Sequence, residues 1–194
     1  MNGIGHNGGP TLEPGSTWRT HCWRAARAAL LPKLPLEVVR LHVRRAAEIG
    51  LDYKTYAGVR ATTGHDLVAF LFSTNALRLL RETDRMAAAD VTKLAGVRQI
   101  GRLVAAQPPL RPAGVVQILA GQGIAVDAAA RAPGLAESWS ETRGQILSLL
   151  GEVRAPADRV LLIGETALER DWVGAARLAG FVPAVQYFGA AVHP

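Results

Sequence analysis

The sequence predicts an α/β fold, namely a small parallel or mixed sheet of about four strands, flanked by helices and preceded by a basic helical N-terminal layer. Two short apolar runs carry this prediction. The segments Leu67 to Phe72 and Val160 to Ile163 are continuously apolar rather than alternating, which is typical of strands covered on both faces. Strand, helix and strand in succession then favour parallel crossover connections.

Length and composition favour one domain with its own core. A chain of 194 residues, 49% of them hydrophobic, can bury a core without disulfides. Cys22 is the single cysteine, which excludes an internal disulfide framework and a cysteine-rich zinc site. The apolar runs are too short to cross a bilayer and no signal-peptide pattern opens the chain, so we expect a cytoplasmic protein without a membrane partner.

The N-terminal part predicts an arm followed by helices. Residues 1–15 contain five glycines and two prolines, which oppose any regular element, so we expect a flexible glycine-rich arm ahead of a single domain at 16–194. A first helix is expected through Trp23 to Leu31, and prolines separate it from a second one of about Leu36 to Ile49.

In the second helix, apolar residues recur at helical spacing and predict a stripe that faces the core. These residues are Leu36, Val39, Val43, Ala46 and Ala47.

The elements beyond this helix are predicted from capping residues, breakers and apolar runs. The strands are predicted at 67–72, 101–106, 160–164 and 184–188. Helices are predicted within 51–64, at 77–80, around 87–94, from Ser138 or Ser140 to 150 and at 166–178, and another begins at 115–119. A proline-rich loop is expected at 108–112, and the section that leads to 135 is undetermined.

The charge distribution favours a polyanionic partner. The net charge is +6, and residues 1–60 contain nine Lys or Arg against four Asp or Glu. Clustered cations gain affinity for DNA by releasing its condensed counterions, although a merely solvated basic surface is the alternative. The candidate phosphate contacts are Arg40, Arg44, Arg45, Lys54 and Arg60.

Two tyrosines are interleaved with these cations. Tyr53 and Tyr56 could stack on bases, or they could pack beneath the edge of the sheet.

Ligands of open α/β sheets bind beyond the carboxyl ends of the strands, where two polar segments fall here. Ser73, Thr74 and Asn75 follow the first apolar strand, and Glu165 follows the later one. These side chains could simply cap the next helix. Alternatively, Asn75 presents its amide to a base edge or to a water, and Glu165 acts as an acid or base.

The segments Leu71 to Leu77 and Val160 to Ala167 resemble motifs of the uracil-DNA glycosylase superfamily, the first of them the first motif of its mismatch-specific branch. Ala76 stands where that family has proline, and His193-Pro194 only weakly echoes its second motif. The resemblance implies that the enzyme flips a base out of DNA and hydrolyses its glycosidic bond. It also implies that Asn75 positions the hydrolytic water. Phe72, Ser73 and Thr74, in the same segment, are further candidate substrate contacts, as are Tyr53 and Tyr56.

A modified base in phage DNA is the expected target, which would make the chain part of antiphage defence. No cofactor is expected, and the histidines show no metal-ligand spacing. A non-enzymatic nucleic-acid-binding or phage-related interaction protein is the alternative, and a small-molecule enzyme acting on nucleotides is a third class.

Overall fold

The structure, a computed structural model, describes residues 34–189. The chain divides into two compact units, Met1–Val39 and Arg40–Pro194, and the helix α2 (Leu36–Glu48) crosses their boundary. The predicted arm, the helix through Trp23 to Leu31, Cys22 and His193-Pro194 lie outside the described residues.

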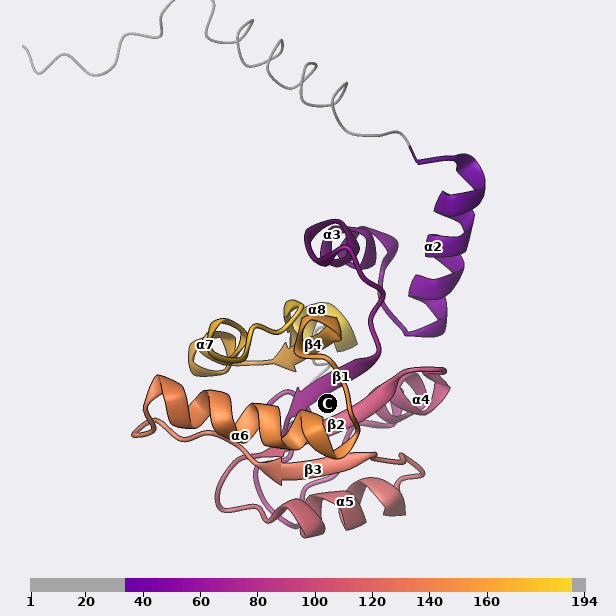
Figure 1. Cartoon of the computed structure of the whole chain (residues 1–194). Helices are drawn as coiled ribbons and strands as arrows, with labels where there is room; N and C mark the ends of the chain where they lie inside the picture. The colour runs from indigo at the N-terminus through magenta and orange to yellow at the C-terminus, as the bar shows by residue number, and fades with distance from the viewer. Residues whose placement is uncertain (1–33, 190–194) are drawn as a thin grey trace, which may run out of the picture. The chain divides into compact units, whose positions relative to one another are not determined.

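The second unit is built on a parallel sheet, which confirms the predicted α/β class (Figure 1). It has five strands in the order β3-β2-β1-β4-β5, and every neighbouring pair is parallel. The strands are β1 (Ala69–Ser73), β2 (Gly101–Ala106), β3 (Ala128–Arg131), β4 (Val160–Gly164) and β5 (Gly180–Pro183). The extra strand is β3, a short alanine-rich segment in the section for which the sequence predicts no element.

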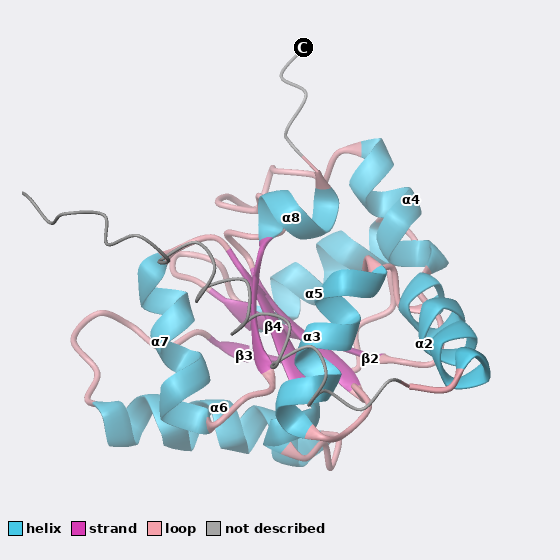
Figure 2. Ribbon diagram, turned by 90° about the horizontal axis from the view of Figure 1, so that it is seen from above, coloured by secondary structure: helices cyan, strands magenta, loops and turns pink. Residues whose placement is uncertain are grey.

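Helices cover both faces of the sheet, and Figure 2 shows α6 and α7 on one side of the strands with α4 and α5 on the other. One core cluster joins the sheet to α3, α4, α5 and α8, and the second joins it to α6 and α7. The bounds of these helices are α3 (Tyr53–Thr63), α4 (Ala88–Gly96), α5 (Pro112–Gly121), α6 (Trp139–Glu152), α7 (Ala167–Ala176) and α8 (Ala184–Phe188).

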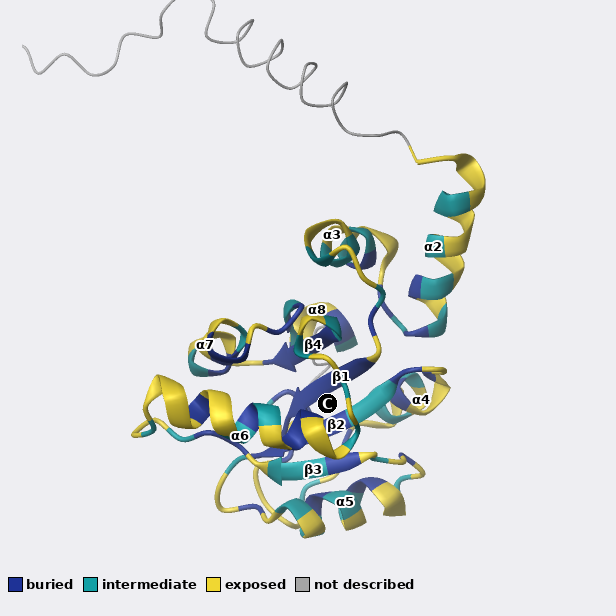
Figure 3. Ribbon diagram, viewed as in Figure 1, coloured by how far each residue is buried: buried dark blue, intermediate teal, exposed yellow. Residues whose placement is uncertain are grey.

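The central strands are buried on both faces, as their continuous apolar sequence predicts (Figure 3). Along β1, Phe70 and Phe72 belong to the first core cluster, while Ala69 and Leu71 belong to the second. No residue of β1 is more than 2% exposed. β1 therefore holds the two layers together, and the loop that leaves it is anchored on a rigid strand.

Two predicted elements are wrong. Residues 77–80 form no helix. The chain makes a turn at residues 74–78, in which Leu79 donates its N–H to the carbonyl of Thr74 and Arg78 takes a left-handed φ of 56°. Residues 184–188 form the helix α8 rather than a strand, because the strand β5 has already ended at Pro183 and Tyr187 turns into the core.

The predicted apolar stripe of α2 is also wrong in part. Leu36 is 63% exposed and Val43 is 46% exposed, while Ala46 is the one buried residue of the helix. Instead, the cation Arg45 turns inward, as described below.

Helix starts and stops follow the sequence closely elsewhere. Ser138 and Thr166 each form a capping box with the glutamate three residues later, and Gly64 ends α3 in a left-handed conformation. No helix of residues 34–189 is both long enough and apolar enough to span a membrane.

Candidate functional site

The carboxyl ends of β1 and β4 lie side by side at the point where the strand order reverses. From β1 the chain continues to β2 on one side, whereas β4 pairs with β1 on the other. The connections that leave such neighbours diverge, and open α/β sheets bind ligands at this edge. We call this edge, at which Asn75 and Glu165 lie, the crevice. Asn75 and Glu165 both follow these two strands, as the sequence predicts.

Ser73 and Thr74 have structural roles in the turn that follows β1. Both are fully buried. The Ser73 hydroxyl accepts a hydrogen bond from the N–H of Ala76 at 3.1 Å, and the Thr74 hydroxyl accepts one from the N–H of Gln107 at 3.0 Å. These bonds close the turn and tie it to the end of β2. The phenyl ring of Phe72 is also buried, 1% exposed, so all three predicted substrate contacts of this segment are covered by the protein.

Asn75 is held by a buried glutamate, Glu169, that is not among the predicted site residues. Its Nδ2 donates to Oε1 of Glu169 at 2.9 Å, across 94 positions of sequence. Glu169 is 0% exposed, whereas Asn75 is partly exposed. This contact fixes the rotamer of Asn75 and joins the loop after β1 to α7.

The other carboxylate oxygen of Glu169 completes the start of α7. Its Oε2 accepts the backbone N–H of Glu165 at 2.6 Å and that of Thr166 at 2.8 Å. Since these are the orphan donors that bind anions at other helix N-termini, the start of α7 already has its anion. A phosphate group is therefore excluded from this position.

The orientation of the Asn75 amide follows from the same contacts. A carboxylate only accepts hydrogen bonds, so the amide nitrogen must face Glu169 and the amide oxygen must face away. Among the described residues no donor reaches Asn75 Oδ1. The crevice thus presents an oriented acceptor, with the exposed residue Glu165 at the adjoining strand end.

The crevice is closely packed on its β5 side. A Cβ atom on Gly164 would lie 2.5 Å from the Phe181 ring and 3.1 Å from the Glu169 carboxylate. Only glycine fits at the end of β4, which lets Phe181 and Glu169 approach the backbone. The guanidinium of Arg170 lies 4.9 Å above the Phe181 ring.

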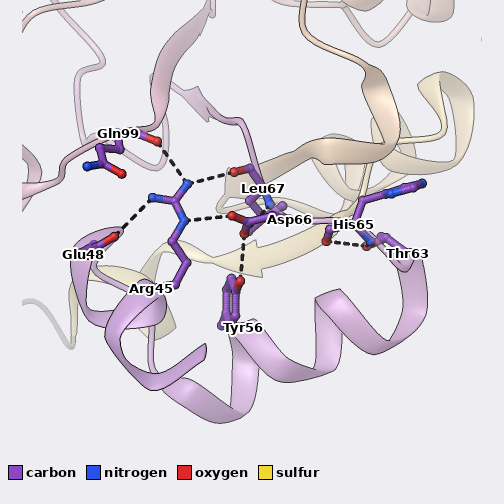
Figure 4. Close-up of polar contacts among 8 residues, drawn as sticks. All are labelled: Arg45, Glu48, Tyr56, Thr63, His65, Asp66, Leu67 and Gln99. Atoms are coloured by element: carbon purple, nitrogen blue, oxygen red, sulfur yellow. Dashed lines mark hydrogen bonds and ion pairs between the residues drawn. The ribbon is translucent and has the colours of Figure 1, made fainter. Parts of the chain in front are cut away.

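Arg45, a predicted phosphate contact, instead binds groups of the protein itself (Figure 4). Its guanidinium contacts Asp66 Oδ2 at 3.0 Å, the Leu67 carbonyl at 3.2 Å and the Gln99 carbonyl at 3.1 Å. Glu48 lies 3.6 Å away on the same helix. Because these partners precede β1 and β2, Arg45 lies at the amino edge of the sheet, opposite Asn75.

Tyr56 joins the same network, which agrees with packing beneath the sheet edge rather than with base stacking. It is 1% exposed, and its hydroxyl donates to Asp66 Oδ1 at 2.8 Å. Burial, followed by the bond to Asp66, raises the pKa of Tyr56 above its ordinary value. Tyr53 is 37% exposed at the start of α3.

The remaining predicted contacts lie on α2 and α3. Arg40 and Arg44 are exposed on α2, and Arg60 is half-buried near the end of α3. Lys54 lines a groove of about 470 Å³ between α3 and β5, where Thr55 accepts a hydrogen bond from Gln186 at 2.8 Å. No contact in the described residues connects these cations with Asn75.

The described residues contain no group of three or more His, Cys, Asp or Glu side chains that could hold a metal ion. Comparison of the chain with protein-family models, with curated proteins and with solved structures gives no match. The geometry of the crevice therefore carries the functional argument.

Proposed function

We propose that the chain is a DNA glycosylase in which Asn75 positions the water that hydrolyses the glycosidic bond of a flipped base. The observation that carries this proposal is the Asn75–Glu169 contact, which leaves an immobilised amide oxygen at the strand-order reversal. The resemblance of the segments around Asn75 and Gly164 to glycosylase motifs supports the same role.

The proposed chemistry needs an acceptor that holds water and a base that removes its proton. Asn75 Oδ1 accepts a hydrogen bond from the water, whose oxygen forms the new bond to C1′ as the bond to the base nitrogen breaks. The exposed Glu165 carboxylate takes the proton of the water, and the departing base is protonated from solvent. The buried negative charge of Glu169 favours the positive charge that develops on the sugar.

The experiment uses full-length protein and oligonucleotides that contain either normal bases, uracil or modified bases. After incubation, alkali treatment converts abasic sites into strand breaks, which are resolved on a denaturing gel. We expect breaks at a subset of the non-standard bases. We expect Asn75→Ala to abolish the breaks while DNA binding remains.

Two control variants make the result specific. Glu165→Gln removes the proposed base at an exposed position, so it should slow excision without lowering the melting temperature. Thr62→Ala changes an exposed residue of α3 and should leave excision unchanged. Unchanged cleavage by Asn75→Ala would overturn the role of Asn75, and the lack of breaks in every substrate would overturn the glycosylase.

A second candidate function is nucleic-acid binding without catalysis, and it is favoured by the burial of the side chains that precede Asn75. Phe72, Ser73 and Thr74 are buried, so the site offers a substrate fewer groups than the motif implies. This candidate predicts DNA binding that survives Asn75→Ala and yields no abasic sites.

A further inference from the structure

We infer that the chain binds the phosphodiester backbone of DNA through arginines that follow β1 and β2, rather than through its basic N-terminal layer. The residues of this arginine surface are Arg78, Arg81, Arg85 and Arg111. The inference rests on the proposed function only for the class of ligand, and the test below measures binding independently of catalysis.

The sequence between β1 and α5 has a second concentration of positive charge. Residues 78–111 contain seven Lys or Arg and three Asp or Glu. Two of the seven turn inward, since Lys93 donates to the Tyr187 carbonyl and Arg102 donates to the Val97 carbonyl. The arginine surface and Arg98 remain exposed.

Most of the arginine surface forms no close ion pair, although the charge of Asp84 also attracts Arg81 and Arg85. Arg78 lies 3.5 Å from Asp90, whereas within the described residues no carboxylate forms an ion pair with Arg81, Arg85 or Arg111. Arg85 Nη1 contacts only backbone carbonyls of its own loop, at 2.7 and 3.0 Å.

Asp84, an acidic residue of the same loop, accepts hydrogen bonds from the backbone. Asp84 accepts the N–H groups of Leu80 and Arg81, both at 2.8 Å, and these bonds hold its pKa below the ordinary value. Asp84 therefore shapes the loop that presents the arginines, and its oxygen that accepts both bonds is not available to pair with a guanidinium.

A cavity lies beside this loop. It measures about 310 Å³ and is lined by Glu82, Arg85, Gly114, Gln117 and Ile118. Its walls come from the loop after β1 and from α5, and Arg111 stands at the N-terminus of α5 without a side-chain cap. Arg85 and Gln117 can donate to a phosphate oxygen, whereas the Glu82 carboxylate in the same lining repels one, so the site depends on its arginine donors.

The position of the arginine surface also suits a target base in the crevice. Its four residues follow the carboxyl ends of β1 and β2, the edge at which Asn75 lies. In contrast, Arg45 is bound at the amino edge by Asp66. Since the start of α7 holds Glu169, the crevice cannot take the phosphates and neighbouring loops must.

The test measures binding of full-length protein to a fluorescent DNA 20-mer by anisotropy at several salt concentrations. The triple variant Arg81→Ala, Arg85→Ala, Arg111→Ala should bind about tenfold or more weakly, and its slope of log affinity against log salt should fall by about 2 to 3. The matched control removes the same charge on the α6 and α7 side, through Arg143→Ala, Arg154→Ala and Arg177→Ala, and should bind like wild type.

A third variant set addresses the N-terminal layer through Arg40→Ala, Arg44→Ala and Arg60→Ala. Binding by the first triple variant within twofold of wild type would overturn the inference, as would an equal loss in the control, or no DNA binding by the wild-type chain. A loss confined to the third set would assign DNA binding to the N-terminal layer instead. Excision that fails while this binding pattern holds would count against the glycosylase alone.

Discussion

Glu169 is the residue whose replacement tests the crevice most directly. Glu169→Ala removes the acceptor of three hydrogen bonds from a side chain that is 0% exposed. A buried donor left without a partner costs about 1–3 kcal/mol, and a lost helix cap costs about 1 kcal/mol. Since Glu165 and Thr166 are exposed, water can reach their N–H groups, and the expected total is about 2–4 kcal/mol.

Urea unfolding of the full-length protein measures this loss, and a double-mutant cycle with Asn75→Ala isolates the contact. If the two side chains interact as the geometry indicates, the combined loss should be smaller than the sum of the single losses by about 0.5 kcal/mol or more. A loss below about 1 kcal/mol for Glu169→Ala, or full additivity, would refute this argument.

Glu169→Gln separates stability from orientation. A glutamine at this third helical position keeps the capping box, because its carbonyl oxygen can still accept the N–H groups of Glu165 and Thr166. Its amide nitrogen then faces Asn75, which must turn its own oxygen inward to accept the bond. We expect a loss of only about 1 kcal/mol but a crevice that presents a donor in place of an acceptor, so excision should fail in a folded protein.

The other predictions concern the frame around the crevice. Asp52 caps α3, and hydrogen bonds from Thr55, first from its hydroxyl and then from its N–H, lower the pKa of Asp52. The charged cap therefore stabilises α3 at neutral pH, and this stabilisation is lost below about pH 4. In urea unfolding between pH 5 and 3, wild type should lose more stability than Asp52→Asn. Asp66→Ala should cost about 2–3 kcal/mol, against under about 0.5 kcal/mol for its exposed control Asp158→Ala. Gly164→Ala should cost about 1–3 kcal/mol, while Gly144→Ala, with open space around it in α6, should gain about 0.5–1 kcal/mol; both are measured as shifts in melting temperature, and equal effects would contradict the packing at β4.

The central strands could be predicted because their sequence carries the information locally. Leu67 to Phe72 and Val160 to Ile163 are apolar at every position, and in runs this short that pattern is typical of a strand buried on both faces. β3 could not be predicted, since Ala128 to Arg131 has low strand propensity and pairs with β2 through its backbone. The strand predicted at 184–188 is wrong for a related reason. The aromatic residues of α8 favour a strand locally, and they form a helix because Tyr187 packs on β1.

The charged residues show the same division. Arg45 and Arg44 are adjacent in sequence and equally basic, and only the tertiary partners Asp66 and Gln99 decide that Arg45 turns inward. Charge counts therefore locate cations without locating their partners. The second concentration at 78–111 is partly hidden in the sequence totals, because residues 112–194 contain six Arg against eight Asp or Glu and offset about half of it.

Glu165 and Glu169 pose the sharpest case, since both are glutamates at the start of one helix. Sequence places either of them at a helix N-terminus, where a carboxylate is favourable, and the capping-box spacing from Thr166 identifies Glu169 as the one that turns back. That spacing does not reveal the donor across the crevice, because Asn75 arrives from 94 positions away. Once the pair is formed, it dictates the chemistry of the edge. A buried carboxylate satisfies the helix dipole, the amide it holds presents an acceptor, and phosphate recognition has to come from arginines on neighbouring loops.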